Sequence, residues 1–457
     1  MTATYVERLG AFIASRKADS MTETVRQKLQ SCLLFNLSVA FGAPHADAVR
    51  LALEALHAAS GNAACWRTGA SLTPADAAFR NAALISARGQ NDTHAAINGH
   101  IGCVAIPAVF ALAQATGATA ADVRAALLCA YDVAPLIAHD AAMKSGERGF
   151  RGTSLYGVFA AAAGAARVLR LDARQCAVAL SLASQFCGGT MQCWAEGTPE
   201  WLMQVGLASR AGVVAALLAQ DGMTATSLAL EGPNGFYRAF SGAIPDWHWD
   251  GEPTNEILNV TFKPFPGCTI NQLPVKTLLD CKAREAFNAA EVEHMSLALH
   301  PAYARYPGID RYGPFDSAAS AIMSAPYMLQ CALVNGTLTL SDFTPDTGAT
   351  SLHASSRRVA VVADESLAPF HCRIDIGMRD GRAITALSEP PSALSYSFGE
   401  TVSLTEAISE EWRIRDRRSA HARLTDRIVS LCSDSASART FTDLFDAGEF
   451  HRLNEDA

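Results

Sequence analysis

Roughly the first 240 residues of the chain carry apolar residues at helical spacing, and this repeat constrains the fold more than any other feature. Apolar residues that recur every three to four positions predict helices with one buried face. Alanine and glycine are frequent in these segments, and small side chains let helices approach closely, so we expect a compact domain of crossing helices. The predicted helices are Met21–Phe41, Ile101–Thr116, Ala120–Ala142, Gly157–Leu171, Ala173–Phe186 and Leu207–Gly222.

The pattern changes near Pro245, where a polar and tryptophan-containing segment interrupts the helices. β-branched or alternating runs follow as far as about Phe398, together with one helical segment, Gln272–Phe287. This mixture predicts an α+β region with antiparallel strands. The strand-like runs are Ile257–Lys263, Glu291–Ala298, Arg358–Val362, His371–Ile376 and Ala383–Leu387.

The last sixty or so residues return to helical patterns, at Leu404–Trp412 and Leu424–Leu431. We expect these helices to pack against the first domain and make it discontinuous. The predicted fold class is mainly α with an α+β second domain. A large all-helical domain would be built from both chain ends, residues 1–255 and 400–457, and a smaller α+β lid domain would span residues 256–399.

Composition excludes several functional classes. The chain has 457 residues, of which 49% are hydrophobic, so it can bury a large core and is long enough for two domains. Its net charge is −8 and no run of Lys and Arg forms a basic patch, so we expect no nucleic-acid partner. It also lacks a secretory signal pattern and an uninterrupted apolar stretch of about 18 residues. We therefore expect a cytoplasmic protein without a membrane partner.

The twelve cysteines are scattered, and none forms a Cys-x-x-Cys pair. Most of them are expected to be small buried hydrophobic residues, and the scatter argues against a thiolate metal site. The short glycine pairs Gly146-x-x-Gly149 and Gly232-x-x-Gly235 do not match a dinucleotide-binding fingerprint. We predict neither a metal nor a cofactor.

Cationic side chains stand at the ends of predicted elements in this otherwise apolar chain. Arg148 and Arg151 lie in a glycine-containing turn before a helix, and Lys263 lies between two aromatic residues after a strand-like run. Cations fixed in this way suit a small anionic substrate. Without a cofactor motif, they suggest proton transfer at a carbon next to a carboxylate.

Four motifs in this order resemble the MmgE/PrpD family over nearly the whole chain. They are Asp92-Thr93-His94 with His100 before the segment Ile101–Leu112, then Arg148-Gly149-Phe150, Glu231-Gly232-Pro233-Asn234-Gly235-Phe236 and Phe262-Lys263-Pro264-Phe265-Pro266. The family includes 2-methylcitrate dehydratase, cis-aconitate decarboxylase and iminodisuccinate epimerase. The resemblance implies a helical domain from both chain ends, an α+β lid, a homodimer, and catalysis without cofactor or metal at the domain junction.

The resemblance carries His100 and Lys263 over intact, but other positions depart from the family pattern. Arg151 stands where the family has a histidine, Trp201 where it has a lysine, and Gln204 where it has another histidine. Gly102 replaces the serine that follows the active-site histidine. The changes remove proton-transfer groups but retain a permanently charged side chain that can hold a carboxylate by two hydrogen bonds.

The expected activity is that of a cofactor-independent isomerase or lyase that removes a proton α to a carboxylate of a small di- or tricarboxylic acid. Epimerisation needs the fewest proton-transfer groups, and dehydration is the other principal expectation. The alternatives are a decarboxylase of the cis-aconitate type and a family member that binds carboxylates without catalysis. A further alternative is a larger or less charged acid, because Trp194, Trp201 and Met203 would reshape the pocket.

The candidate catalytic residues are His100, Lys263 and Tyr156. His100 is the candidate base, Lys263 is either an acid or base or a fixed counter-charge, and Tyr156 would donate to an enolate oxygen. The alternatives are purely structural roles, namely helix capping for the histidine and packing for the tyrosine. The candidate substrate-binding residues are Arg151, Asp92, Thr93, Arg148, Gln204 and Trp201, of which Asp92 and Thr93 could instead orient His100 or cap a turn, and Arg148 could be a salt-bridge partner.

Overall fold

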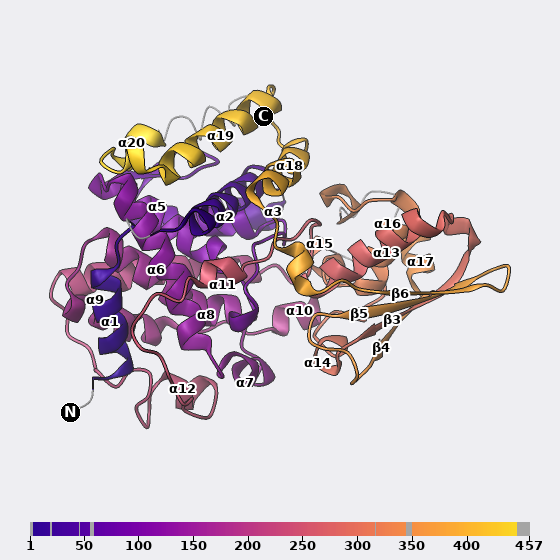
Figure 1. Ribbon diagram of the computed structural model, residues 1–457, viewed down its shortest axis with the longest axis horizontal. Coiled ribbons are helices and arrows are strands. Elements are labelled where there is room, and N and C mark those ends of the chain that lie inside the picture. The colour runs from indigo at the N-terminus through magenta and orange to yellow at the C-terminus, as the bar shows by residue number, and fades with distance from the viewer. Residues whose placement is uncertain are drawn as a thin grey trace.

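The computed structural model describes residues 3–18, 21–44, 46–54, 59–315, 317–343 and 350–445. The predicted end of the helical domain beyond residue 445 lies outside this range. A larger helical part and a smaller part with a sheet lie side by side (Figure 1). The predicted fold class, mainly α with an α+β second region, is confirmed.

The larger part is built around α8, whose four consecutive alanines, Ala160–Ala163, are fully buried. This alanine face allows α6 and α11 to pack directly against α8. One short hairpin, β1 (Ser60–Ala64) with β2 (Ser71–Leu72), departs from the all-helical prediction. The helices are α1 (Tyr5–Ser15), α2 (Glu23–Phe41), α3 (Asp47–Glu54), α4 (Pro74–Ser86), α5 (Gly102–Thr116), α6 (Ala120–Ala138), α7 (Ala142–Glu147), α8 (Gly152–Val168), α9 (Ala173–Ala183), α10 (Gln192–Glu196), α11 (Trp201–Gln220) and α12 (Phe236–Phe240).

The last helices of the chain, α18 (Phe398–Ser409), α19 (Arg417–Cys432) and α20 (Phe441–Leu444), pack on the helices of the N-terminal half. Figure 1 shows them in yellow above α2 and α5. The Trp412 indole donates to Ser38 O at 2.9 Å, which ties this segment to α2. The exact boundaries predicted for the two domains stay a prediction.

The smaller part is a four-stranded sheet with the order β4-β3-β5-β6. Helices α13 and α16 contact the strands and lie on one side of the sheet in Figure 1. Buried and partly exposed residues alternate along β5, as expected of a sheet covered on one face. The elements are α13 (Gln272–Glu285), β3 (Val292–Leu299), α14 (Pro301–Ala304), α15 (Ala318–Ala321), α16 (Ala325–Asn335), α17 (Thr350–Ser356), β4 (Val359–Ala363), β5 (Cys372–Met378) and β6 (Ala383–Leu387).

Two strand predictions were wrong. β3 and β4 are parallel, with Met295 opposite Val359, because the long helical connection between them returns the chain to the same end of the sheet. The run Ile257–Lys263 is not a strand either. It begins in the 3₁₀ turn Glu256–Asn259, and its backbone bonds to two separate segments, at Thr261 with Thr93 and at Phe262 with Leu394 O, without forming a strand ladder. This segment crosses from one part of the molecule to the other and leads into Lys263.

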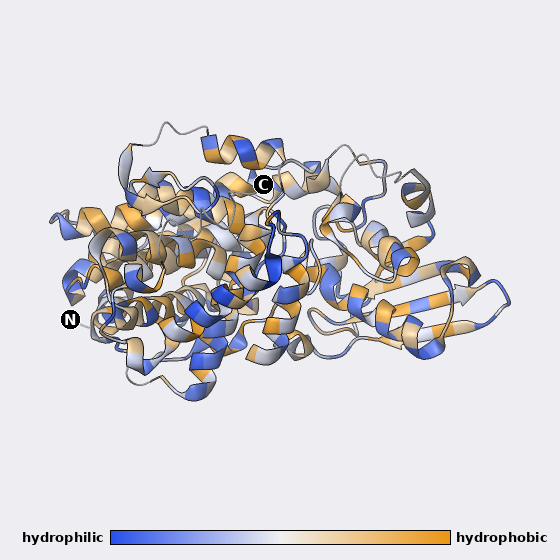
Figure 2. Ribbon diagram, turned by 90° about the horizontal axis from the view of Figure 1, so that it is seen from above, coloured by the Kyte–Doolittle hydropathy of each residue, from blue (hydrophilic) through white to orange (hydrophobic). Residues whose placement is uncertain are grey.

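Helix α11 is the one helix, among the described residues, whose length and mean hydropathy would allow it to cross a membrane. In this fold it packs against α4, α8 and α9, and Val205, Val213 and Ala216 are buried there. Figure 2 shows hydrophobic residues on helices throughout the larger part, whereas the tip of the β5–β6 hairpin is hydrophilic. The hydropathy of α11 is therefore accounted for by its position in the helical core.

Candidate functional site

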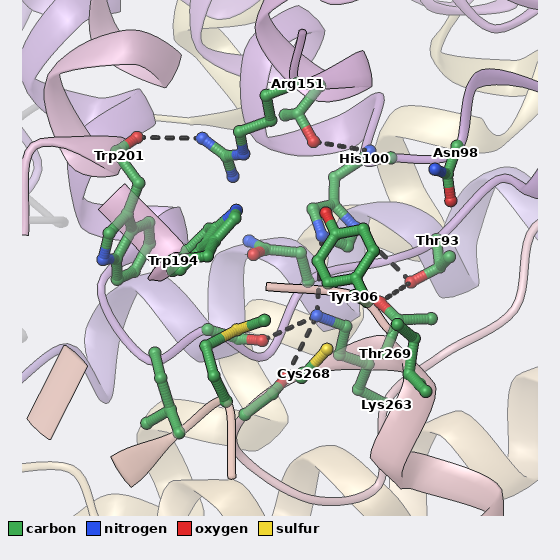
Figure 3. A pocket seen from close by; sticks show the side chains of 18 of the residues that line it. Thr93, Asn98, His100, Arg151, Trp194, Trp201, Lys263, Cys268, Thr269 and Tyr306 are labelled. Atoms are coloured by element: carbon green, nitrogen blue, oxygen red, sulfur yellow. Dashed lines mark hydrogen bonds between the residues drawn. The ribbon is translucent and has the colours of Figure 1, made fainter. Parts of the chain in front are cut away.

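A pocket lies where the helical part meets the α+β part, and both parts supply its walls (Figure 3). It encloses about 650 Å³ of unoccupied space, including its open mouth. No Asp or Glu is among its described lining residues. The polar and aromatic lining side chains include Thr93, Asn98, His100, Arg151, Trp194, Trp201, Lys263, Thr269, Tyr306 and Phe370.

His100 lies two residues before α5, and its ring orientation is fixed by backbone atoms. Nδ1 is 2.6 Å from Asp92 O and 3.4 Å from Thr93 Oγ1, while the His100 backbone N–H donates to Thr153 Oγ1 at 3.2 Å. Because a carbonyl oxygen only accepts, Nδ1 carries the hydrogen, and Nε2 of the neutral ring is unprotonated. Nε2 is 3.5 Å from Lys263 Nζ. The free lone pair of His100 thus lies on the pocket side.

The Asp92 carboxylate points away from the pocket into the helical core. Its Oδ1 accepts from the Gly102 backbone N–H at 3.1 Å, and its Oδ2 accepts from the Tyr131 hydroxyl at 2.5 Å. A Cβ at Gly102 would lie 2.5 Å from Asp92 Oδ2, which explains glycine at this position. A carboxylate at a helix N-terminus is stabilised by the helix dipole. Asp92 therefore fixes the start of α5 and, through its carbonyl, the His100 ring.

Lys263 is only 3% exposed, and its ammonium group lies beside His100. Nζ donates to Gly89 O at 2.8 Å and to Gly267 O at 3.1 Å. Burial lowers the pKa of Lys263 to about 8, and the positive charge of Arg151 contributes to this shift. Two of its three N–H hydrogens are donated to these carbonyl oxygens, so the third is available for His100 or for a ligand.

The same surroundings act on the imidazole. Burial lowers the pKa of His100 well below its usual value, and the cations Lys263 and Arg151 lower it further. The ring is therefore neutral at neutral pH, and its Nε2 can accept a proton.

Arg151 is the N-cap residue of α8, and its guanidinium lies against two indoles that pack on each other. Its backbone N–H donates to Gly189 O at 3.0 Å, and Nη1 donates to Trp201 O at 3.0 Å. The guanidinium carbon lies 5.3 Å from the Trp194 ring centre and 5.9 Å from that of Trp201, both within cation–π range. The side chain is buried, and burial lowers its pKa.

Neither Arg151 nor Lys263 forms a salt bridge with any carboxylate of the described residues. A buried cation without an anionic partner is costly, because desolvation is not offset by attraction. A bound carboxylate would supply the missing charge and would accept two hydrogen bonds from the guanidinium. The pocket is thus electrostatically suited to a small anion.

Besides Asp92, three predicted residues lie outside the pocket lining. The Tyr156 hydroxyl is 3.0 Å from Ser145 Oγ in the helical interior, where burial raises its pKa. Arg148 donates to Ala239 O at 3.2 Å near the surface. Gln204 Oε1 accepts from Arg151 Nη1 at 3.4 Å, so it supports the arginine rather than facing the pocket. The roles predicted for them in binding or catalysis stay predictions.

Sequence reasoning missed several lining residues, of which Tyr306 is the most important. It lies just after α14, in a loop that follows β3, and burial raises its pKa, so its hydroxyl is a donor at neutral pH. Asn98 also lines the pocket, in a left-handed backbone conformation with φ of 47°. The weak signals were an aromatic residue before Pro307-Gly308 and an asparagine before Gly99.

Among the residues described, no three His, Cys, Asp or Glu side chains are grouped so that they could hold a metal ion. A search of curated proteins finds no match to the chain. The family model of the MmgE/PrpD N-terminal domain matches residues 7–248, which include most of the helical part, His100 and Arg151. With more than half of its length matched by that model and the pocket at the junction of its two parts, the chain belongs to the MmgE/PrpD family.

Proposed function

We propose that this protein is a cofactor-independent isomerase or lyase that removes a proton α to a carboxylate of a small di- or tricarboxylic acid. Membership in the MmgE/PrpD family indicates an enzyme of the dehydratase or isomerase type in general. The observation that supports the finer proposal is the neutral His100 ring beside two buried cations that have no carboxylate partner among the described residues.

In the proposed reaction, Arg151 holds a substrate carboxylate and His100 Nε2 takes the α-proton. The C–H bond breaks, an N–H bond forms on His100, and the electron pair moves into the adjacent carboxylate or carbonyl as an enolate-type anion. The Lys263 ammonium group stabilises that charge in a desolvated site, where electrostatic stabilisation is most effective. Returning a proton to the same carbon completes an isomerisation.

Substrate binding itself would strengthen the base. In the empty pocket, burial and the two cations hold the pKa of His100 low, and a weakly basic imidazole is a poor proton acceptor. A bound carboxylate offsets the charge of Arg151 and Lys263, so the pKa of His100 rises towards the working pH. The base is then most effective when substrate is present.

The pocket contains few side chains that can transfer a proton. His100, Lys263 and the Tyr306 hydroxyl are the lining groups suited to proton transfer, since burial raises the pKa of Cys268. Epimerisation needs one group to remove the proton and one to return it. Dehydration also needs an acid for the leaving hydroxyl, which Lys263 or Tyr306 would supply. We therefore place epimerisation first and dehydration second.

The test is proton NMR in D₂O with methylcitrate, citrate, cis-aconitate, iminodisuccinate and malate. Loss of the α-proton signal with inversion of the centre supports an epimerase, and loss with a new vinyl signal supports a dehydratase or a decarboxylase. His421→Gln is the control, because His421 is buried on α19, where its Nε2 is 2.8 Å from Thr405 Oγ1, away from the pocket. Carboxylate binding without exchange for every acid would contradict the proposal and indicate a member without catalysis.

A further inference from the structure

We infer that the substrate carries an uncharged, largely apolar arm that occupies a second chamber next to the candidate site. This inference rests on the proposed function and specifies the class of acid that the site accepts. The second chamber encloses about 790 Å³ of unoccupied space, part of it open to solvent. Three side chains, Thr93, Thr269 and Phe370, line both it and the first pocket.

Between the first pocket and the second chamber, part of the boundary is formed by the side chains of Thr93 and Thr269. Thr93 Oγ1 and Thr269 Oγ1 are 3.4 Å apart, at the long limit of hydrogen bonding, and Figure 3 shows them facing each other below His100. Such a contact contributes little stability. The two threonine side chains therefore form a weakly bonded wall, and rotation of either one would let a substrate at His100 extend into the second chamber.

Phe370 forms the aromatic part of the boundary. It follows β4 in a loop, its φ of 64° lies in the left-handed region, and its ring packs on Tyr303 with centroids 4.6 Å apart. This conformation is rare for a bulky residue and occurs where surrounding structure imposes it. The ring is thus held where it contacts both chambers, as a side chain that selects among substrates would be.

The chemistry of the second chamber differs from that of the first. Its walls are mostly apolar, with Leu258, Leu273 and Leu394, and its polar groups are hydroxyls and one amide. Among the described residues, no Lys, Arg, Asp or Glu lines it. Lys28 is buried and donates to the lining residue Ser395, from Nζ to Oγ at 2.8 Å, but Lys28 itself does not line the chamber. An uncharged arm fits these walls better than a second carboxylate does.

The first pocket supports the same substrate class. At Trp201 and Gln204, where the family resemblance leads one to expect a lysine and a histidine, the chain has an indole and an amide. Two buried indoles, Trp194 and Trp201, pack on each other and contact Arg151. Fewer cations and more aromatic surface suit an acid with fewer charges and a larger apolar portion.

The experiment measures binding by calorimetry, and α-proton exchange in D₂O, for 2-methyl-, 2-propyl- and 2-pentylsuccinate. A fourth probe, 2-(4-carboxybutyl)succinate, matches the pentyl arm in length but ends in a carboxylate. We expect affinity to rise about fourfold for each added methylene group, the ratio that corresponds to burying one CH₂. The terminal carboxylate should abolish that gain.

Ser392→Trp places an indole at the exposed rim of the second chamber and should lower the pentyl-to-methyl affinity ratio at least tenfold. Ser403→Trp adds the same indole to an exposed position of α18, outside the pocket linings, and should leave the ratio as in the wild type. Exchange of 2-methylsuccinate with no dependence on arm length, or tighter binding of the charged arm, would overturn the inference alone. Binding that follows arm length without any exchange would overturn the proposed function and leave the inference standing. Failure of every succinate to bind would overturn both.

Discussion

The helical core and the candidate pocket both bury cations, but they treat them differently. In the core, Arg16 faces Asp132 at 3.5 Å, and Arg88 faces Glu411 at 2.9 Å. In the pocket, Arg151 and Lys263 face carbonyl oxygens, indoles and an imidazole. The core cations are paired within the chain, whereas the pocket cations have no carboxylate partner in the part of the chain that the structure describes. Unpaired buried cations such as Arg151 and Lys263 raise the free energy of the empty protein, and an anion bound from solution would lower it.

The largest expected effect separates the two kinds of cation by stability. Arg88→Leu leaves the partly buried Glu411 without its partner and should cost roughly 3 kcal/mol of unfolding free energy. Arg151→Leu removes a desolvated cation that has no carboxylate partner, so it should cost far less. Urea unfolding of both variants measures the difference. Equal losses would mean that Arg151 is a structural cation like Arg88.

The next effect concerns catalysis at the pocket. His100→Ala and Lys263→Ala should each lower turnover by about 10² or more, the usual scale for removing an acid or base group. Both variants should remain folded, because among the described residues neither side chain has a salt-bridge partner that the substitution would leave unpaired. Exchange rates in D₂O, together with thermal unfolding, check this prediction. Wild-type turnover in the His100 variant would remove that residue from the mechanism.

A smaller effect sharpens the role of Arg151. Arg151→Lys keeps the charge but loses the planar pair of donors, so it should weaken carboxylate binding about tenfold with little change in kcat. Calorimetric affinity and steady-state kinetics measure the two quantities separately. A fall in kcat at unchanged affinity would show that Arg151 acts on the reacting atoms instead.

The smallest predicted effect is the pH dependence. If the Lys263 ammonium group stabilises the anion, kcat/KM should be half its maximum near pH 8, the pKa to which burial lowers this group, and should fall further above it. On the acid side, kcat/KM should persist below pH 6, because the pKa of His100 lies well below its usual value. Lys263→Arg should lose the alkaline limb. A rise through pH 8 would instead make Lys263 the base.

The sequence predicts the long core helices α2, α5, α6, α8, α9 and α11 because their signal is local, but α1 and α4 were not predicted. The alanine-rich segment from Gly157 onward lies within α8, and periodicity alone is enough to find it. The parallel pairing of β3 with β4 was missed, because it depends on where a connection of about sixty residues returns the chain. Strand pairing depends on residues far apart in the sequence, so the periodicity within one segment does not predict it.

The site shows the same division. His100, Arg151 and Lys263 stand in recognisable motifs and do line one pocket. Tyr306 and Phe370 come from loops of the α+β part, far along the chain from His100, and no motif points to them. The Asp92 side chain turns inward because Gly102 and Tyr131 bind it there, which its position in the sequence does not reveal. The homodimer and the cytoplasmic location stay predictions.

The most direct test of the contrast between paired and unpaired cations is a count of protons taken up on carboxylate binding. Calorimetric titration of methylcitrate at pH 8.5, in buffers of different ionisation enthalpy, gives that number. Because the pKa of Lys263 is lowered to about 8, its amine is neutral in most protein molecules at this pH. A bound carboxylate should raise that pKa again. We predict uptake of more than half a proton per site in the wild type and a clear loss of uptake in Lys263→Met. Binding without proton uptake, or equal uptake in both proteins, would contradict the claim that the buried cations of the pocket receive an anion.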